Sequence, residues 1–209
     1  MSEKKKISNF SNLCNIFGLR PRVPVETIVT TREKEYFHAS AMGLWIQSSF
    51  LVLKAYKTSK TLTLIKKTGT CVINFTYDIR AFVVAALKKT LSNFNLDIIT
   101  LGESHARLAD AIAWIKAQKI SMTDKETYVE ITLKLLNGEI NSNCYYAWCR
   151  SDFLILEALI KATRLPVYRG TKKEKILKDE ILRISQECLR ITANAEREKS
   201  IFEVILAEL

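Results

Sequence analysis

The spacing of apolar residues in this chain changes near residue 150, and this change limits the possible folds more than any other feature. Over residues 127–136 almost every second residue is apolar. After residue 170 the apolar residues recur at alternating steps of four and three, as in Leu177, Ile181, Ile184, Cys188 and Ile191. Alternation is typical of β-strands, and the second spacing is typical of amphipathic helices. The sequence therefore predicts a β-rich body followed by a helical segment.

Strands rich in β-branched and aromatic residues are expected at residues 25–31, 37–46, 50–56, 70–76, 109–120 and 127–136. A short helix is expected after the third strand, capped by Thr58 and Ser59 and ended by Gly69. A second helix follows Asp78, and three more begin near residues 151, 171 and 196. We expect an N-terminal arm at residues 1–22, a β-rich body at 23–145 and a helical segment at 146–209.

The net charge of +10 is concentrated in the first half of the chain. Residues 1–100 contain 15 Lys/Arg and 6 Asp/Glu, whereas residues 101–209 are almost balanced. A basic half attracts phosphates, nucleic acid or acidic partners. Because 48% of the residues are hydrophobic, the chain can bury a core, which excludes a disordered protein.

The termini and the cysteines predict a cytoplasmic protein without a metal. The chain has no apolar run of about 20 residues that could span a membrane, and its polar start does not read as a secretory signal. Five cysteines form no C-x-x-C motif and are accompanied by only two histidines. We therefore expect reduced thiols, no structural metal site and no supported Cys–His catalytic pair.

The most informative local motif is Lys57-Thr58-Ser59-Lys60-Thr61 at the start of the first expected helix. The first turn of a helix presents unpaired N–H groups and a partial positive charge. Hydroxyl and ammonium groups added there could hold a phosphate monoester. An ordinary helix cap with solvated lysines explains the same residues. Nucleoside triphosphate chemistry has no support, because the chain contains no Walker or dinucleotide glycine pattern.

Two further features could serve a ligand. Residues 39–43 (ASAMG) are small, so a flat ring could lie against the strand, although such a pattern more often reflects close packing against a helix. Asn74 interrupts an apolar strand, and a buried amide there must find hydrogen-bond partners in the backbone or in a ligand.

Five motifs stand out by their order and spacing: residues 25–31 (VETIVTT), 38–45 (HASAMGLW), 58–61 (TSKT), 68–69 (TG) and 72–78 (VINFTYD). In this order they resemble the archaeal family called domain of unknown function 447, whose members are FMN-binding split-barrel proteins related in fold to flavin reductases. Similar short matches follow at residues 108–115, 157–165 and 196–198, so the likeness covers about residues 25–209.

The resemblance implies an α+β fold: a six-stranded antiparallel split β-barrel, a C-terminal helical segment, and a homodimer with FMN near the subunit interface. It implies that Ser40, Ala41, Met42 and Gly43 line the flavin ring. The phosphate would be held by Thr58, Ser59, Lys60 and Thr61. Polar contacts nearby would come from Thr30, Thr31, Asn74 and Thr76.

Two positions depart from the family pattern. The strand reads His38-Ala39-Ser40-Ala41-Met42-Gly43, where the family usually has Asn-Ala-Ala-Pro-Met-Gly. Lys57 precedes the helix cap, where the family usually has an arginine. Lysine can supply a point charge but not a bidentate fork.

The function expected from the resemblance is an FMN-binding flavoprotein, either an oxidoreductase or an electron carrier of unknown substrate, with no named catalytic acid or base. One alternative is a homodimer on the same fold that lacks flavin and serves an interaction role. A second is a nucleic-acid binder, which the absence of an RNP-type motif disfavours.

Overall fold

The computed structural model describes residues 5–17, 19, 24–87, 95–141, 150–192 and 194–209. The chain forms two compact units. The first, which we call the barrel unit, comprises residues 1–77 and 96–145, and the second, the helical unit, comprises residues 78–95 and 146–209.

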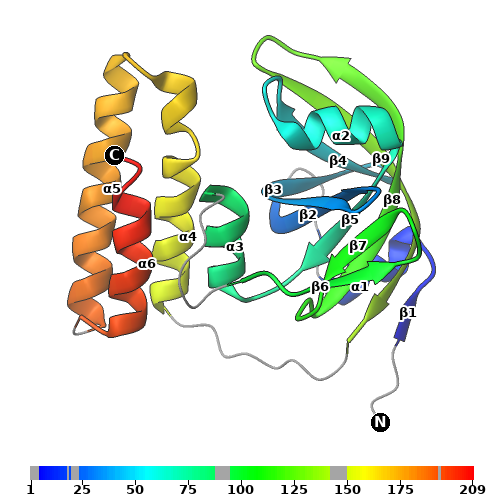
Figure 1. Ribbon diagram of the computed structural model, residues 1–209, viewed down its shortest axis with the longest axis horizontal. Helices are drawn as coiled ribbons and strands as arrows, with labels where there is room; N and C mark the ends of the chain where they lie inside the picture. Colours follow the sequence, from blue (N-terminus) through cyan, green and yellow to red (C-terminus); the bar gives the residue numbers. More distant parts are fainter. Residues whose placement is uncertain (1–4, 18, 20–23, 88–94, 142–149, 193) are drawn as a thin grey trace. The chain divides into compact units, whose positions relative to one another are not determined.

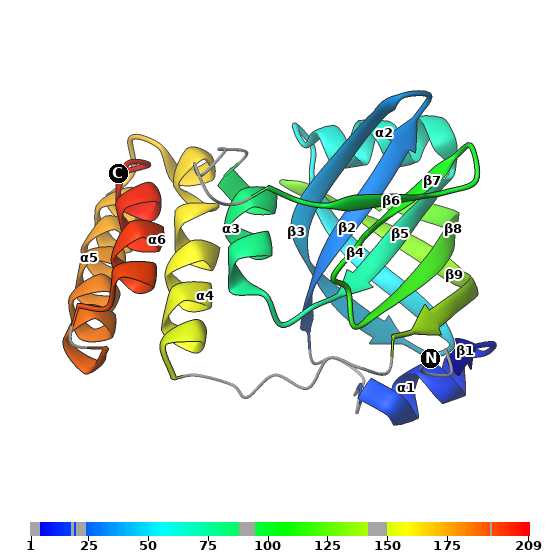
Figure 2. The ribbon, with the colours of Figure 1, turned by 60° about the horizontal axis from the view of Figure 1, so that its bottom comes forward.

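Six antiparallel strands close into a barrel in the order β9-β4-β3-β2-β5-β8, and β8 pairs back with β9 (Figures 1 and 2). The split-barrel fold predicted from the sequence is therefore confirmed. The strands are β2 (Val25–Glu33), β3 (Tyr36–Gln47), β4 (Phe50–Tyr56), β5 (Thr70–Phe75), β8 (Ala113–Asp124) and β9 (Tyr128–Ile140).

The barrel interior is filled by the alternating apolar residues that the sequence pattern indicated. On β9, Val129, Ile131 and Leu133 are buried, while Glu130 and Thr132 between them remain partly exposed. Facing strands contribute side chains of the same kind to one continuous core. Burying each such side chain contributes about 1.5–3 kcal/mol, so the alternation itself fixes which face of every strand turns inward.

The barrel opens where β3 and β4 separate. These strands pair only over Leu44–Gln47 and Phe50–Leu53. The first half of β3 pairs with β2 alone, and the second half of β4 pairs with β9. The chain then enters helix α2 (Lys60–Thr68), which lies across one end of the barrel and packs against β2, β3, β4 and β5 (Figure 1).

A hairpin that the sequence patterns did not predict covers the outer face of β2 and β5. It consists of β6 (Ile98–Leu101) and β7 (His105–Leu108). The strands have only four residues each, so their alternation is too short to recognise. Asn74 accepts a hydrogen bond from the Leu108 amide at 2.8 Å, which anchors the hairpin to β5.

The N-terminal segment, expected as an arm at residues 1–22, belongs to the barrel unit. Strand β1 (Lys5–Ile7) pairs with Gly138–Ile140 on β9, and helix α1 (Phe10–Phe17) follows it. Leu13 of this helix is completely buried, and the Phe17 ring stacks on Phe75 at 4.4 Å. The apolar residues that make these contacts lie among serines and asparagines. The sequence pattern therefore did not predict these contacts.

The helical unit contains α3 (Ile79–Leu87), α4 (Arg150–Ala162), the 3₁₀ turn η1 (Leu165–Tyr168), α5 (Lys172–Ile191) and α6 (Glu196–Leu206) (Figure 1). Contacts group α3 with the C-terminal helices, so this unit draws on two segments of the chain and not only on residues 146–209. Half of the capping box expected at Thr171 forms, since its hydroxyl accepts from the Glu174 amide at 3.4 Å. The Glu174 carboxylate accepts from the Gly170 amide at 2.6 Å, and the Thr171 amide donates to the Tyr168 carbonyl.

Candidate functional site

The start of α2 has the geometry that the hydroxyl-rich motif predicted. Ser59 is the N-cap, and its hydroxyl accepts a hydrogen bond from the Leu62 amide at 3.2 Å. At the other end Gly69 adopts the left-handed conformation, with φ of 73°, and its amide donates to the Ile65 carbonyl. The helix therefore presents a regular first turn whose amide groups carry a partial positive charge.

Three polar side chains meet at this helix start. The Thr61 hydroxyl donates to the Ser40 hydroxyl at 2.8 Å, and Nε2 of His38 lies 3.1 Å from Ser40 Oγ and 3.2 Å from Thr61 Oγ1. His38 and Ser40 lie two residues apart on β3, so both side chains point to the same face of the sheet. We call these three residues and Thr31 the hydroxyl–imidazole cluster.

Thr31 joins this cluster from β2. It lies directly opposite His38 in the strand register, and directly opposite residues of an antiparallel pair point to the same face. Thr31 is 2% exposed, and its hydroxyl has no hydrogen-bond partner. Leaving such a group unpaired costs about 1–3 kcal/mol. The cluster therefore contains a buried hydroxyl that is not satisfied within the protein.

The two lysines of the motif make different contacts. Lys60 extends over the ring of Tyr36 with its ammonium 4.0 Å from the ring centroid, and so stays at the rim of the cluster. Lys57 forms an ion pair with Asp124 at 2.5 Å. Thr58 is exposed beside the cap. Of the two lysines, Lys60 is therefore the one placed to meet an anion at the helix start.

The small residues of β3 divide between the two faces of the sheet. Ser40 and Met42 point to the inner face, where Met42 is 9% exposed and belongs to the core. Ala41 and Gly43 point outward. The Trp45 indole lies against Gly43 so closely that a Cβ there would be 2.8 Å from its Cη2. The five residues expected to support a ring thus do not form one uniform surface.

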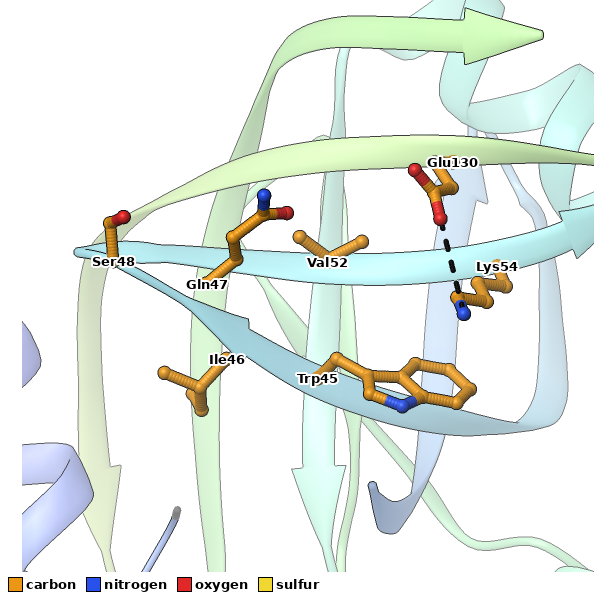
Figure 3. A pocket seen from close by; sticks show the side chains of 7 residues that line it. All are labelled: Trp45, Ile46, Gln47, Ser48, Val52, Lys54 and Glu130. Carbon is orange, nitrogen blue, oxygen red and sulfur yellow. Dashed lines mark ion pairs between the residues drawn. The ribbon is translucent and has the colours of Figure 1, made fainter. Parts of the chain in front are cut away.

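A hollow of about 540 Å³ lies beyond Trp45 on the outer face of β3, β4 and β9 (Figure 3). The ammonium of Lys54 lies 4.6 Å from the Trp45 ring centroid, 5.5 Å from that of Tyr128 and 3.9 Å from a carboxylate oxygen of Glu130. Sequence reasoning missed this arrangement because its residues come from three strands. The available signal was that Trp45 and Gly43, two residues apart on β3, point to the same face.

Asn74 and Thr30 lie on the opposite face from the cluster. The Asn74 amide donates to the Ile28 carbonyl at 2.8 Å and to the Thr30 hydroxyl at 3.1 Å, and it accepts from the Leu108 amide. Thr30 donates in turn to the Ala106 carbonyl. Both residues are completely buried. The question that the sequence left open has a clear answer: the partners of this amide are protein groups beneath the β6–β7 hairpin.

Thr76 lies directly after β5 and is buried, at 8% exposure. The structure therefore brings together Thr31, Ser40, Ser59, Lys60 and Thr61 with the unexpected His38. It separates from them the residues on the outer face or beneath the hairpin, namely Thr30, Ala41, Gly43 and Asn74. The signal that could have found His38 is its parity with Ser40 on β3.

The thiols that the structure describes are unsuited to nucleophilic chemistry. Burial raises the pKa of Cys71 to about 12. Burial, with a further contribution from the Glu198 carboxylate, raises the pKa of Cys188 to about 11. A thiol must ionise to act as a nucleophile. Within the described ranges no three His, Cys, Asp or Glu side chains gather into a metal site, and no helix has the length and apolar character to cross a bilayer.

Comparison with solved structures places the fold among flavin-binding proteins. The crystal structure of an FMN-bound protein from Methanosarcina mazei aligns with 93% of this chain and 99% of its own, at a TM-score of 0.73 and 23% identity. Flavoredoxin from Methanosarcina acetivorans covers 69% of this chain and 79% of its own, at a TM-score of 0.51 and 13% identity. The flavin reductase HpaC, complexed with NADP+, covers 65% and 89%, at 0.51 and 16%.

No curated protein matches the chain significantly in sequence. A family model does: the one described as protein of unknown function (DUF447), N-terminal domain, matches residues 25–142, which is more than half of the chain. These residues include β2 to β5, helix α2 and the hydroxyl–imidazole cluster. The family suggested by the order of the motifs is thereby confirmed: the chain belongs to the DUF447 family.

Proposed function

We propose that the barrel unit binds FMN, with the phosphate at the start of α2 and the ring along β3. The observation that carries this proposal is the hydroxyl–imidazole cluster, in which Thr31 is buried without a partner opposite His38, and His38 contacts Thr61 in the first turn of α2. The phosphate dianion would be held by the amide groups of the first turn, by the polar groups of Ser59 and Thr61, and by Lys60. Thr58 would contribute from the exposed edge.

The residues present fit a phosphate better than they fit the ring. The phosphate end offers hydroxyls, an imidazole and an ammonium around a positive helix end. At the ring end, Ala39 and Ala41 place only methyl groups on the outer face of β3, and the described part of this strand does not pair with β4 before Leu44. Backbone groups along this stretch could read the edge of a heterocycle. Bound flavin supplies one- and two-electron redox chemistry, which supports a role as an oxidoreductase or electron carrier.

A second candidate is a flavin-free barrel that serves an interaction role. The observation that favours it is the Trp45 indole, which covers Gly43 at one end of the proposed ring surface. Both candidates are proposed as homodimers, in keeping with the family resemblance, and exposed aromatic residues on β3 and β4 support an interface there: Tyr36, Phe37, Phe50 and Tyr56. Multi-angle light scattering at micromolar concentration tests the dimer.

The decisive experiment is the visible absorption spectrum of the purified protein, followed by titration with FMN. We expect flavin bands or saturable quenching of FMN fluorescence. Lys60→Ala should weaken FMN binding about five- to tenfold, because it removes one charge-assisted contact. Lys66→Ala is the matched control, since it removes an exposed ammonium from the last turn of the same helix.

A colourless protein that leaves FMN fluorescence unchanged at all concentrations would refute flavin binding and favour the flavin-free candidate. Equal FMN affinity in Lys60→Ala and Lys66→Ala would refute the phosphate position at the start of α2. Circular dichroism of both variants should match that of the wild type, because both side chains are exposed.

A further inference from the structure

The turn that leads into helix α2 lies beside the tip of the β8–β9 hairpin (Figure 1). Tyr56, the last residue of β4, pairs with Tyr128, the first residue of β9. The chain turns directly afterwards, because the Ser59 amide donates to the Tyr56 carbonyl at 2.9 Å. The hairpin turns next to it, where the Lys125 amide donates to the Tyr128 carbonyl at 2.9 Å. Strand pairing therefore holds the approach to the helix beside the hairpin tip.

One ion pair joins these two turns. The ammonium of Lys57 lies 2.5 Å from a carboxylate oxygen of Asp124, the last residue of β8. The two side chains are 44% and 72% exposed. An exposed ion pair contributes little to stability, because water screens it and both side chains lose freedom on forming it. The contact can therefore be exchanged for another one at small cost.

Covalent geometry leaves Lys57 within reach of the start of α2. Lys57 lies two residues before the N-cap Ser59, so their Cα atoms are at most about 7.6 Å apart. A flexible four-carbon stem lets the ammonium swing over such a distance without movement of the backbone. Lys57 is thus kept from the helix start by its contact with Asp124 and not by its place in the chain.

A carboxylate so close to the start of a helix is unfavourable for an anionic ligand. Asp124 opposes such a ligand in two ways: it occupies the ammonium of Lys57, and it adds a negative charge beside the helix start. A phosphate monoester carries up to two negative charges and three acceptor oxygens, whereas a carboxylate carries one charge. The phosphate of a ligand at the start of α2 can therefore compete with Asp124 for this ammonium.

We infer that Asp124 is a positioning residue of the proposed FMN site, which holds the ammonium of Lys57 at the hairpin tip until the phosphate dianion displaces its carboxylate. The inference rests on the proposed function and adds a competition to it. In the exchange Lys57 leaves Asp124 and pairs with a phosphate oxygen, while the carboxylate returns to water. Removal of the Asp124 charge therefore improves phosphate binding, which loss of a merely structural ion pair would not do.

The test measures the affinities of the wild type and of Asp124→Asn for FMN and for riboflavin by fluorescence quenching. Asp124→Asn should tighten FMN binding about three- to fivefold, the upper range for one exposed ion pair. Its affinity for riboflavin, which has no phosphate, should equal that of the wild type. A gain of the same size for both flavins would place the effect at the ring and overturn the inference.

Glu126→Gln is the matched control, because it removes the same charge from an exposed position in the same hairpin turn. Solvent screens its charge from the helix start, so its FMN affinity should stay within about 1.5-fold of the wild type. If Glu126→Gln tightens FMN binding as much as Asp124→Asn does, the gain reflects net charge alone and the inference is overturned.

A double-mutant cycle shows whether Asp124 acts through Lys57. In a Lys57→Ala background, Asp124→Asn should change FMN affinity less than about twofold, because no ammonium is left to be released. A full three- to fivefold gain in that background overturns the inference. All these side chains are exposed, so circular dichroism of the variants should match that of the wild type.

The remaining outcomes separate this inference from the proposed function. Equal FMN affinity in the wild type and in Asp124→Asn overturns the inference while FMN binding stands. If neither protein binds FMN, the proposed function itself fails. A crystal structure of the unmodified protein with FMN gives a test that needs no variant: the Lys57 ammonium should contact a phosphate oxygen, and an ammonium still bound to Asp124 beside an occupied phosphate site overturns the inference.

Discussion

The two units of the protein use buried polar side chains in opposite ways. In the helical unit, Arg197 on α6 contacts Asp152 on α4 at 2.7 Å and Glu198 at 3.0 Å, and Ser151 donates to Glu198 at 3.1 Å. The charged groups of this network are paired, because Arg197 contacts both carboxylates. In the barrel unit, the cluster at the start of α2 is built from neutral hydroxyls and one imidazole, and Thr31 has no partner.

The difference distinguishes a structural network from the proposed binding site. Buried charges are tolerated when each one is paired, and the helical network meets this condition for Asp152 and Glu198. The three buried side-chain atoms without a partner in the described residues all belong to the barrel unit: Thr31 Oγ1, His105 Nε2 and Trp114 Nε1. Unmet hydrogen-bonding capacity beside a helix start is what a ligand can satisfy.

The largest expected effect tests the helical network. Arg197→Ala should lower the free energy of unfolding by about 3 kcal/mol, because it removes the guanidinium that contacts both buried carboxylates. FMN affinity should not change. Chemical denaturation followed by circular dichroism measures the loss. Arg190→Ala is the control, since its ion pair with Glu187 is exposed and worth less than about 1 kcal/mol; equal losses in both variants would contradict the structural role.

Asn74→Ala tests the satisfied polar group inside the barrel unit. We expect a loss of about 1–3 kcal/mol, because the Leu108 amide loses its acceptor beneath the β6–β7 hairpin. Hydrogen exchange of this hairpin should accelerate. Asn137→Ala, at an exposed position of β9, should stay within about 0.5 kcal/mol of the wild type. If Asn74→Ala weakened FMN binding without affecting stability, the amide would belong to the site after all.

His105 should make the barrel unit less stable in acid. Burial, with repulsion from Lys116, lowers its pKa below 6.5. The unfolded chain therefore takes up the proton first, so the stability that His105 confers is complete above about pH 6.5 and is lost as pH falls through its folded-state pKa. Denaturation at pH 5 and pH 7.5 should reveal a drop that is smaller in His105→Asn. An identical drop in both proteins would assign the acid sensitivity to other groups.

The smallest change in stability is expected for Thr31→Val, and its sign is the informative result. Removing an unpartnered buried hydroxyl while keeping its shape should leave stability unchanged or raise it by up to about 1 kcal/mol. FMN binding should weaken severalfold. Thr30→Val is the matched control: the same substitution one residue earlier removes a bonded hydroxyl and should destabilise the barrel unit. A destabilised Thr31→Val would mean that the hydroxyl has a structural partner.

Much of the barrel and of the candidate site could be predicted from the sequence. Enrichment in β-branched and aromatic residues, with clear alternation over residues 127–136, predicted all six barrel strands. Ser59 and Gly69 predicted the ends of α2 because capping is a local property of the backbone. Sequence reasoning failed at the short β6–β7 hairpin and at β1, which are held by distant partners rather than by their own patterns.

The sequence by itself determined the order of the elements and the polar chemistry at the start of α2, because periodicity and capping act over a few neighbouring residues. Only the tertiary structure decided which residues these polar side chains contact. It joined His38 to Thr61 across 23 positions of the chain, turned Asn74 to the hairpin, and paired Lys57 with Asp124. Strand register and barrel closure bring such residues together, and both depend on contacts between distant segments.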